Sequence, residues 1–321
     1  MGFGVRINQF KEGDTLEKVL DIKQLSKKYG KKTALEGITF SVPEGTCFGL
    51  LGPNGAGKST TMKILTGIVE ADQGTAIILG MNSNENRLAI KQQVGYVPQS
   101  ITLYEDLNAY DNLLFFGQMY GVKGSQLKER ITRVLIQTGL LDRAKDKVKE
   151  YSGGMKRRIN IAAALLHDPK ILILDEPTVG IDPQSRNHIF DMIRSLKEEG
   201  VTIIYSTHYM EEVEALCDEI AIIDNGKIII QGNLKELLEQ HSDKSIFIDT
   251  DQIEILKQLP NVNKVSSKDD GWMIESDQPI ALLQDILATC TEQGIEIREL
   301  EMMRPTLESV FLSLTGTSLR D

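Results

Sequence analysis

A glycine-rich segment in the first quarter of the chain combines the residue types that hold phosphate groups. It reads Gly-Pro-Asn-Gly-Ala-Gly-Lys-Ser from Gly52 to Ser59, and it lies between the apolar segment Cys47 to Leu51 and the helical pattern Thr60 to Leu65. Glycines let backbone amides close around phosphate oxygens, and the N-terminus of the following helix adds partial positive charge. Lys58 is suited to the β- and γ-phosphates of a nucleotide, and Ser59 to Mg²⁺.

This strand-loop-helix setting predicts a P-loop for Mg²⁺ and ATP rather than a glycine-rich turn that happens to carry a lysine. The expected nucleotide contacts within it are Gly52, Pro53, Asn54, Gly55, Ala56, Gly57, Lys58, Ser59 and Thr60.

A pair of carboxylates follows a second apolar strand pattern. The segment Lys170 to Leu174 runs into Asp175 and Glu176, as expected of the strand that accompanies a P-loop. Asp175 is suited to hold Mg²⁺, directly or through water. Glu176 is suited to orient or deprotonate the water that attacks the terminal phosphate. The plainer alternative is two acidic residues that cap a strand.

The elements around these motifs alternate between strand and helix patterns. The expected strands are Thr46 to Leu51, Thr75 to Leu79, Lys170 to Leu174, Val201 to Tyr205 and Ile220 to Ile223. Such alternation predicts an α/β fold with a largely parallel sheet. Two helical patterns, Leu107 to Tyr120 and Gln126 to Thr138, follow one another without a strand. They predict a helical subdomain at about residues 100–165, inserted into the sheet-forming sequence.

The segment Tyr151 to Met155, Tyr-Ser-Gly-Gly-Met, resembles the signature loop of ATP-binding cassette (ABC) ATPases. Alone, Ser-Gly-Gly before a helix is compatible with a simple N-cap. Together with the P-loop and the carboxylate pair it is specific, and four further residues fall in the order of this family: Tyr29, Gln99, Asp182 and His208. The resemblance covers about Asp21 to Asn233 and implies a P-loop NTPase of ABC type.

The resemblance also implies roles for individual residues. ATP on one P-loop would be completed by the signature group of a second copy, in a head-to-tail homodimer; this group is Ser152, Gly153, Gly154 and Asp182. ADP lacks the γ-phosphate, so it could not bridge the two copies. The implied catalytic residues are Glu176, His208 and Gln99, and the implied metal-binding residues are Ser59, Gln99 and Asp175.

Each accessory residue also has an ordinary explanation. Tyr29 resembles the aromatic residue that stacks on adenine, but a tyrosine near a strand end is also common in packing. Gln99 fits a surface loop, and His208 fits a core or capping position. Asp182 before Pro183 is suited to cap a helix.

The signature segment departs from the commonest Leu-Ser-Gly-Gly-Gln at both ends, where Tyr151 and Met155 stand. Together with Arg304 to Glu308 and Val310 to Leu312, it resembles bacterial ABC-2-type exporters of drugs, lipids and sodium. This resemblance implies a separate multi-spanning permease. The implied dock is a groove between the Gln99 segment and the helical subdomain, lined by Ile101, Leu103, Tyr104, Leu107, Phe115 and Phe116. The alternative for the two phenylalanines is the subdomain's own core.

Three domains are expected along the chain: an N-terminal extension at residues 1–20, the ABC ATPase domain at 21–240 and an accessory domain at 241–321. The accessory pattern is strand 245–248, helix 252–258, strand 262–265, strand 272–274, helix 280–288 and strand 295–300. This order predicts a ferredoxin-like α+β domain. A last helix is expected between Pro305 and Gly316, with Leu307, Val310, Phe311 and Leu314 on one face. The domain is expected to stabilise the dimer or to sense a ligand.

Composition limits the classes of partner that the chain can have. The net charge of −10 argues against a nucleic-acid partner, because such a protein must neutralise phosphates. No apolar run reaches the roughly 18 to 20 residues of a membrane span, and residues 1–20 do not resemble a signal peptide. We therefore expect a protein that stays in the cytosol, and the resemblance to exporters implies a peripheral position on the cytoplasmic side of the cell membrane. The three widely spaced cysteines predict neither a disulfide framework nor a zinc site.

Two other function classes compete with the exporter subunit. One is a soluble ABC ATPase that acts on the ribosome or on DNA. The other is a small-molecule kinase, which would leave the signature segment, Gln99 and His208 without a purpose.

Overall fold

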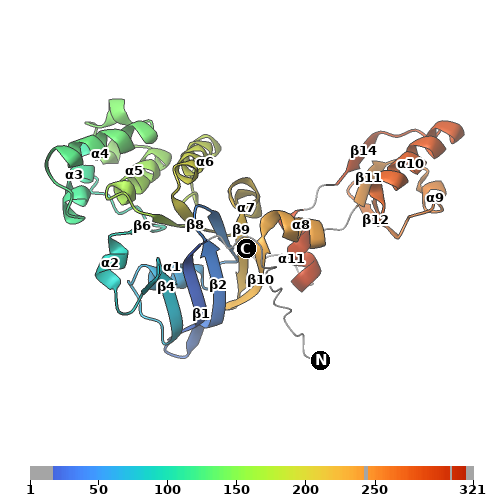
Figure 1. The fold of residues 1–321 in the computed structure, drawn as a ribbon. Helices are drawn as coiled ribbons and strands as arrows, with labels where there is room; N and C mark the ends of the chain where they lie inside the picture. Colours follow the sequence, from blue (N-terminus) through green and yellow to red (C-terminus); the bar gives the residue numbers. More distant parts are fainter. Residues whose placement is uncertain (1–16, 242–244, 304–305, 316–321) are drawn as a thin grey trace. The chain divides into compact units, whose positions relative to one another are not determined.

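The computed structural model describes residues 17–241, 245–303 and 306–315. Their contacts divide the chain into two compact units, one ending at Leu234 and one beginning at Lys235 (Figure 1). The division falls after the first residue of helix α8 (Leu234–His241), whereas the sequence placed it after residue 240. The N-terminal extension lies mostly outside the described residues, and its last residues belong to strand β1 (Lys18–Tyr29).

The central sheet of the first unit has six strands in the order β10-β9-β3-β8-β7-β6. Their bounds are β3 (Cys47–Leu51), β6 (Val94–Val97), β7 (Ile171–Asp175), β8 (Thr202–Thr207), β9 (Glu219–Asp224) and β10 (Lys227–Asn233). All neighbouring pairs are parallel except β9 and β10. That pair turns back through Asn225 and Gly226, which both have positive φ, as a two-residue hairpin requires. The largely parallel α/β sheet is confirmed.

A second, antiparallel sheet was not expected. It has the order β2-β1-β4-β5, with β2 (Lys32–Pro43), β4 (Gln73–Ile78) and β5 (Met81–Asn82). The segment Thr75 to Leu79, expected in the parallel sheet, therefore contributes its strand to this one, because it pairs with β1. Helix α1 (Lys58–Leu65) contacts both sheets, and its buried side chains share one core with theirs. Phe40 of β2 stacks on Phe48 of β3 in this core, with ring centroids 5.1 Å apart.

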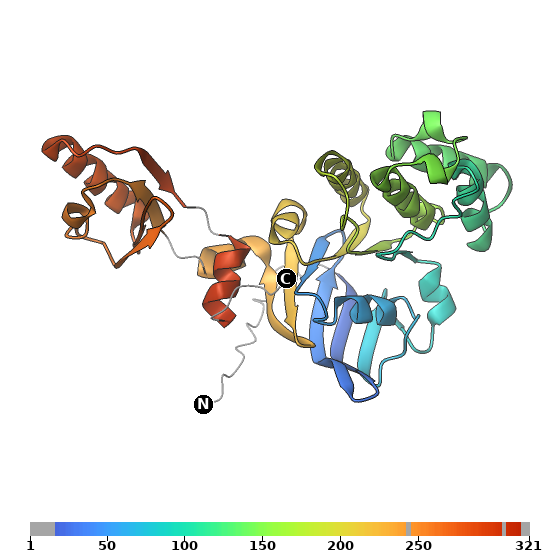
Figure 2. The same cartoon turned by 180° about the vertical axis from the view of Figure 1, so that it is seen from behind.

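The helical subdomain lies away from the antiparallel sheet, and β6 leads into it (Figures 1 and 2). It contains α3 (Ala109–Met119), α4 (Gly124–Gln137), α5 (Gly153–Leu165) and the short 3-10 turns Leu141–Arg143 and Val148–Glu150. The amphipathic pattern of α4 buries Leu127, Ile131, Val134 and Leu135 against its neighbours. Asn108 caps α3 by accepting a hydrogen bond from the amide of Asp111.

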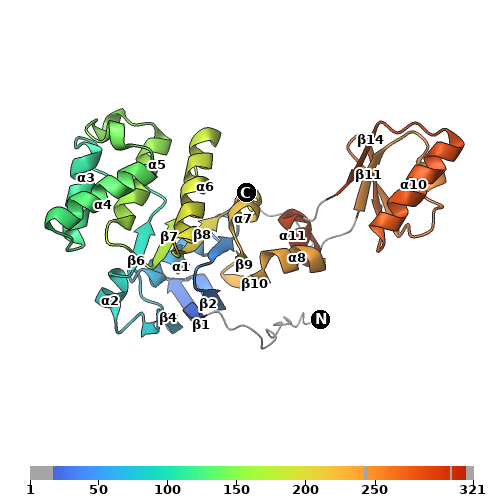
Figure 3. The same ribbon diagram turned by 45° about the horizontal axis from the view of Figure 1, so that its top comes forward.

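Three further helices complete the first unit: α2 (Arg87–Lys91), α6 (Pro183–Glu198) and α7 (Met210–Leu216). Figure 3 shows α6 beside α5, and residues of the two helices are in contact. Helix α7 follows β8 and contacts both β8 and β3. The loops between these elements meet at the carboxyl ends of the parallel strands, where ligands of open α/β sheets bind.

The second unit contains a ferredoxin-like domain, as expected. Its elements are β11 (Ser245–Asp249), α9 (Ile253–Leu256), β12 (Lys264–Lys268), β13 (Gly271–Glu275), α10 (Pro279–Gln293) and β14 (Glu299–Met302). The antiparallel sheet has the order β12-β13-β11-β14 over a core that includes Ile246, Ile274, Leu282 and Ile286. Helix α11 (Leu307–Thr315) buries Leu307, Val310 and Phe311. Pro305, Gly316 and the side chain of Leu314 lie outside the described part of the chain.

Candidate active site

The loop between β3 and α1 has the backbone of a phosphate cradle. Gly55 and Gly57 have φ values of 82° and 118°, which side chains rarely adopt. A Cβ atom at Gly52 would lie 2.1 Å from the carbonyl oxygen of Ile223, so only glycine fits there. Unlike α5 and α6, helix α1 has no side chain capping its N-terminus among the residues that the structure describes. Its first amides therefore remain available to an anion.

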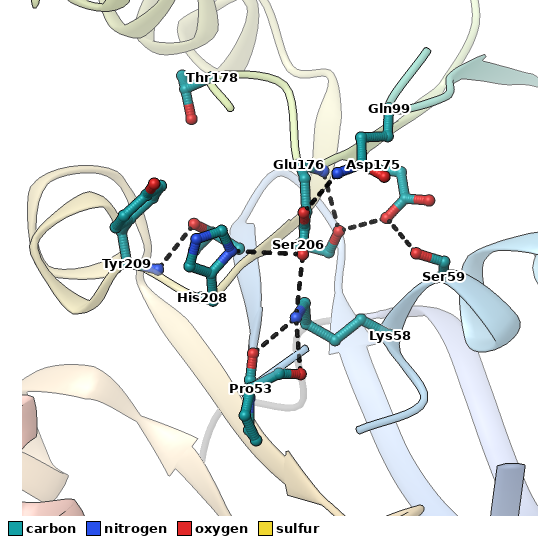
Figure 4. Close-up of polar contacts among 12 residues, drawn as sticks. Pro53, Lys58, Ser59, Gln99, Asp175, Glu176, Thr178, Ser206, His208 and Tyr209 are labelled. Atoms are coloured by element: carbon teal, nitrogen blue, oxygen red, sulfur yellow. Dashed lines mark hydrogen bonds and ion pairs between the residues drawn. The ribbon is translucent and has the colours of Figure 1, made fainter. Parts of the chain in front are cut away.

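Lys58 occupies the centre of this cradle and is 4% exposed. Its ammonium group donates to the carbonyl oxygens of Gly52 at 2.6 Å and Pro53 at 3.1 Å. It also lies 3.0 Å from Oε1 of Glu176 (Figure 4). The lysine of the loop and the carboxylate at the end of β7 thus form one buried ion pair.

Asp175 connects the P-loop helix α1 to strand β8. Its Oδ1 accepts hydrogen bonds from Ser59 Oγ at 3.2 Å and from Ser206 Oγ at 2.8 Å. Burial leaves Asp175 only 2% exposed. Figure 4 shows the three side chains converging from α1, β7 and β8. The arrangement places a carboxylate and a hydroxyl side by side, next to the phosphate cradle.

Glu176 is held from several sides. Its Oε2 accepts a hydrogen bond from Gln99 Nε2 at 2.9 Å, and its Oε1 lies 3.5 Å from Nδ1 of His208. Its backbone adopts a φ of 47°, which is uncommon outside glycine, and its amide donates to the carbonyl oxygen and the hydroxyl of Ser206 at 3.1 Å. The ring of His208 packs on Tyr209 with centroids 4.0 Å apart. Three residues predicted separately, Gln99, Glu176 and His208, therefore meet at one carboxylate (Figure 4).

A cavity of about 320 Å³ opens between the cradle, Gln99 and Glu176, and His208 is not among the residues that line it. Its lining is Tyr29, Lys32, Ala34, Asn54, Gly55, Gly57, Lys58, Ser59, Thr60, Gln99 and Glu176. Tyr29 is 47% exposed, so packing within this chain leaves much of its ring free. Lys27 lies over that ring, with Nζ 5.7 Å from its centroid.

The signature group does not line this cavity. Ser152 caps α5 by accepting a hydrogen bond from the amide of Met155 at 3.2 Å, and Gly153 beside it is exposed. Gly154 is buried, and a Cβ atom there would lie 2.1 Å from Ser185 Oγ. Asp182 caps α6 through the amide of Ser185 at 2.9 Å, with Pro183 as first helical residue, as expected. This amide bond holds the pKa of the Asp182 carboxyl below its usual range.

Two residues of the site were missed from the sequence. Ser206 bridges Asp175 and the amide of Glu176. The sequence analysis assigned no role to this serine, which lies two residues before His208. Arg157, 3% exposed on α5, donates to the carbonyl oxygens of Pro98, at 2.8 Å, and Gln99. Burial lowers the pKa of its guanidinium. The signal in the sequence that could have pointed to Arg157 is its position near the start of the helix that follows the signature segment.

The residues present fit Mg²⁺ and a nucleoside triphosphate. The oxygens of Ser59, Asp175 and Gln99 are the hard ligands that Mg²⁺ prefers, and this ion takes few of its ligands from protein when phosphate supplies others. The glycine backbone, the uncapped start of α1 and Lys58 suit the phosphates. The fold and this site together define a P-loop nucleoside triphosphatase with an inserted helical subdomain.

Comparison with known proteins defines the family. Residues 35–179 match the family model described as "ABC transporter", and residues 232–315 match the one described as "ATP-binding protein DrrA1-3-like, C-terminal domain". The linearmycin resistance ATP-binding protein LnrL of Bacillus subtilis is 45% identical over 311 residues, covering 94% of this chain and 100% of that protein. The Nod factor export ATP-binding protein I of Ralstonia nicotianae is 37% identical, covering 94% and 95%.

Solved structures agree. An ATP-binding subunit of an ABC transporter is 32% identical with a TM-score of 0.63, covering 69% of this chain and 92% of that one. CbiO1 from Clostridium perfringens, part of the transporter complex cbiONQ, is 29% identical with a TM-score of 0.64, covering 70% and 91%. The chain belongs to the ABC transporter ATP-binding proteins, and it is an ATPase subunit of a transporter. Within its described residues, no helix is both long enough and apolar enough to span a bilayer.

Proposed function

We propose that this chain is the ATP-hydrolysing subunit of an exporter, that it dimerises head-to-tail around two Mg²⁺-ATP, and that it drives a permease on a separate chain. One observation carries the proposal. The cavity gathers the P-loop, Gln99 and Glu176, but Ser152 and Gly153 are exposed outside it. A nucleotide in that cavity would thus contact one half of the expected site and leave the other half free for a second copy.

The buried ion pair supports a mechanism for hydrolysis. Phosphate oxygens entering the cradle would compete with Glu176 for Lys58, which lies 3.0 Å away. The carboxylate released from the lysine could then orient a water molecule and accept its proton. Gln99 would hold Oε2 of Glu176 in place, and His208, directly after β8, would face the terminal phosphate.

Ser59, Asp175 and Gln99 would hold Mg²⁺. When bound, the ion would neutralise charge on the β- and γ-phosphates. Tyr29, half exposed at the rim of the cavity, would stack on the adenine.

The start of α5 suits the other side of the nucleotide. Ser152 and Gly153 present a helix N-terminus on the surface, where its partial positive charge attracts an anion. Gly154 lies beneath them against Ser185. The γ-phosphate held on the P-loop of one copy would bind at this terminus of the other, and Asp182 would shape the neighbouring loop.

An exposed aromatic patch supports the permease. Tyr104, Leu107, Phe115 and Met119 are 50%, 40%, 38% and 69% exposed, and the Tyr104 and Phe115 rings meet edge to face with centroids 5.1 Å apart. Exposed apolar clusters of this kind commonly mark protein contacts. The names of the two relatives, linearmycin resistance and Nod factor export, favour an exporter. Its ATPase subunit would lie on the cytoplasmic face of the membrane, with no nucleic-acid partner.

Dimerisation is testable with Glu176→Gln, which keeps the shape of the site but removes the base. In Mg²⁺-ATP this variant should elute as a dimer in size-exclusion chromatography with light scattering, and in Mg²⁺-ADP as a monomer. Gly153→Ala, changed on the exposed helix start, should weaken the ATP-dependent dimer of that variant. A monomer that holds ATP under these conditions would refute the head-to-tail arrangement.

The permease is testable by purifying the tagged chain from membranes of its own cells. A multi-spanning protein should copurify, and Phe115→Ser should reduce its recovery at least several-fold. Ile136→Ser is a matched control, because Ile136 is 60% exposed on α4 outside the patch. Recovery with ribosomes and without a membrane protein would favour the soluble ABC ATPase instead.

A further inference from the structure

A buried carboxylate outside the nucleotide cavity joins the two segments that carry Glu176 and His208. Glu212 lies on α7 and is 1% exposed. Its Oε1 accepts a hydrogen bond from Thr178 Oγ1 at 2.6 Å. Its Oε2 accepts from the Tyr205 hydroxyl at 2.9 Å and from Thr207 Oγ1 at 2.8 Å. All the polar side-chain partners of Glu212 in the described chain are thus hydroxyl groups.

A buried carboxylate of this kind lowers the stability of the folded state if its role is only structural. A buried carboxylate without a cation loses its hydration, and hydroxyl donors repay only part of that loss. Apolar residues of similar volume often stabilise a protein as well or better. The Tyr205 hydroxyl acts as a donor to this carboxylate. Burial and the charge of Glu212 raise the pKa of Tyr205 well above its usual range, so the phenol remains protonated and donates.

The positions of two of the donors are informative. Thr178 lies two residues after Glu176, in the loop that begins with the left-handed backbone of that residue. Thr207 directly precedes His208, and its Oγ1 also accepts a hydrogen bond from the amide of Tyr209 at 3.0 Å. An uncommon backbone conformation persists only when its surroundings hold it. Glu212 ties the Thr178 loop to the end of β8, and so holds the loop through contacts that are separate from those of Ser206.

We infer that Glu212 is a positioning residue for ATP hydrolysis: through Thr178 and Thr207 it fixes the carboxylate of Glu176 and the ring of His208 relative to one another. This inference rests on the proposed role of Glu176 as the base. Glu212 itself does not line the nucleotide cavity. Its loss should therefore reduce the rate of the chemical step rather than the binding of ATP.

The most direct test removes the Thr178 hydroxyl, which contacts Glu212 Oε1 at 2.6 Å and the Tyr205 hydroxyl at 3.3 Å, without adding a charge or a cavity. Thr178→Val in the purified full-length protein should lower kcat roughly 10- to 100-fold, because small displacements of reacting groups carry costs of this size. KM should stay within about twofold of wild type. Thr178→Ser, which keeps the hydroxyl, should restore most of kcat. Glu212→Gln should resemble Thr178→Val.

Thr138→Val is a matched control. Thr138 is also buried, at 2% exposed, and donates through Oγ1 to the carbonyl oxygen of Val134 at 2.8 Å, but it lies in the helical subdomain. It should lower thermal stability to a similar degree as Thr178→Val and leave kcat unchanged. Counting sites by ATP-binding stoichiometry separates a lower turnover from a smaller folded fraction.

The outcomes separate this inference from the proposed mechanism. If Thr178→Val and Thr138→Val have the same kcat per binding site, Glu212 is structural and the inference is wrong. If Glu176→Gln retains wild-type turnover, the assignment of the base is wrong instead. A selective loss of kcat in Thr178→Val, rescued by Thr178→Ser and absent in Thr138→Val, supports the inference.

Discussion

Lys58 and Glu176 form an ion pair 3.0 Å long with side chains only 3% and 6% exposed, so the residue expected to bind phosphate and the expected base neutralise one another inside the protein. The lysine comes from the P-loop helix and the glutamate from the end of β7, two segments far apart in the sequence. The loss of either partner leaves the other buried without its counter-ion. The site is therefore coupled to folding stability.

Lys58→Met should lower the free energy of unfolding by on the order of 3 kcal/mol in nucleotide-free buffer, the usual cost of breaking a buried pair. Adding Glu176→Gln should recover at least half of that loss, since the remaining group is then uncharged. Urea denaturation measures both values. Lys63→Met, on the exposed face of the same helix, should change stability by less than about 0.5 kcal/mol. A double variant as unstable as Lys58→Met would show that the loss does not come from the unpaired carboxylate of Glu176.

Gly154 should be replaceable only together with its neighbour on α6. A Cβ atom there would lie 2.1 Å from Oγ and 2.3 Å from Cβ of Ser185, so Gly154→Ala must force the two helices apart. We expect a loss of about 1 to 3 kcal/mol, as for other overpacked sites. Differential scanning calorimetry of the nucleotide-free protein measures it.

Gly153→Ala provides the comparison, because a Cβ atom at Gly153 would meet Ile181 Cδ1 at 3.7 Å, an ordinary contact. This variant should fold with wild-type stability. The double variant Gly154→Ala/Ser185→Gly should regain most of the lost stability. Equal stability of Gly153→Ala and Gly154→Ala would contradict the packing argument.

The parts of the molecule that the sequence predicted are those with local causes. The P-loop needs a strand, consecutive glycines and a helix start within one short segment, and the Asp182 cap needs only Pro183 beside it. What the sequence did not predict depends on distant partners. Nothing in residues 18–43 indicates that β1 pairs with both β2 and β4, and nothing near Gly154 indicates Ser185.

The same distinction applies to the polar network. Glu212 looks like one more acidic residue in an acidic chain until folding brings three hydroxyl groups to it. The helical subdomain was predicted as a unit because its helices bury periodic apolar faces. The sequence left open whether Phe115 lies in the core of the subdomain or at the dock, because helical spacing is the same for a core residue and for a docking residue.

His167 should make stability depend on pH. Its ring stacks on Tyr120 with centroids 3.9 Å apart, and its Nε2 lies 3.2 Å from the carbonyl oxygen of Val94. Since a carbonyl only accepts, Nε2 carries the proton and the buried Nδ1 has none. Burial, the main cause, lowers the pKa of His167 below its ordinary 6.5. The native state therefore binds fewer protons than the unfolded chain once the pH falls below about 6.5.

The contribution of His167 to stability is therefore fully present above pH 6.5, and it is lost as the pH falls toward and through the lower pKa of the native state. The melting temperature should thus drop between pH 7.5 and pH 5.5. In His167→Gln, which retains a donor for Val94 but does not titrate, the drop should be smaller. His188→Gln, which changes a histidine on α6, should keep the wild-type drop. If the two variants respond to pH alike, the titration that matters lies elsewhere.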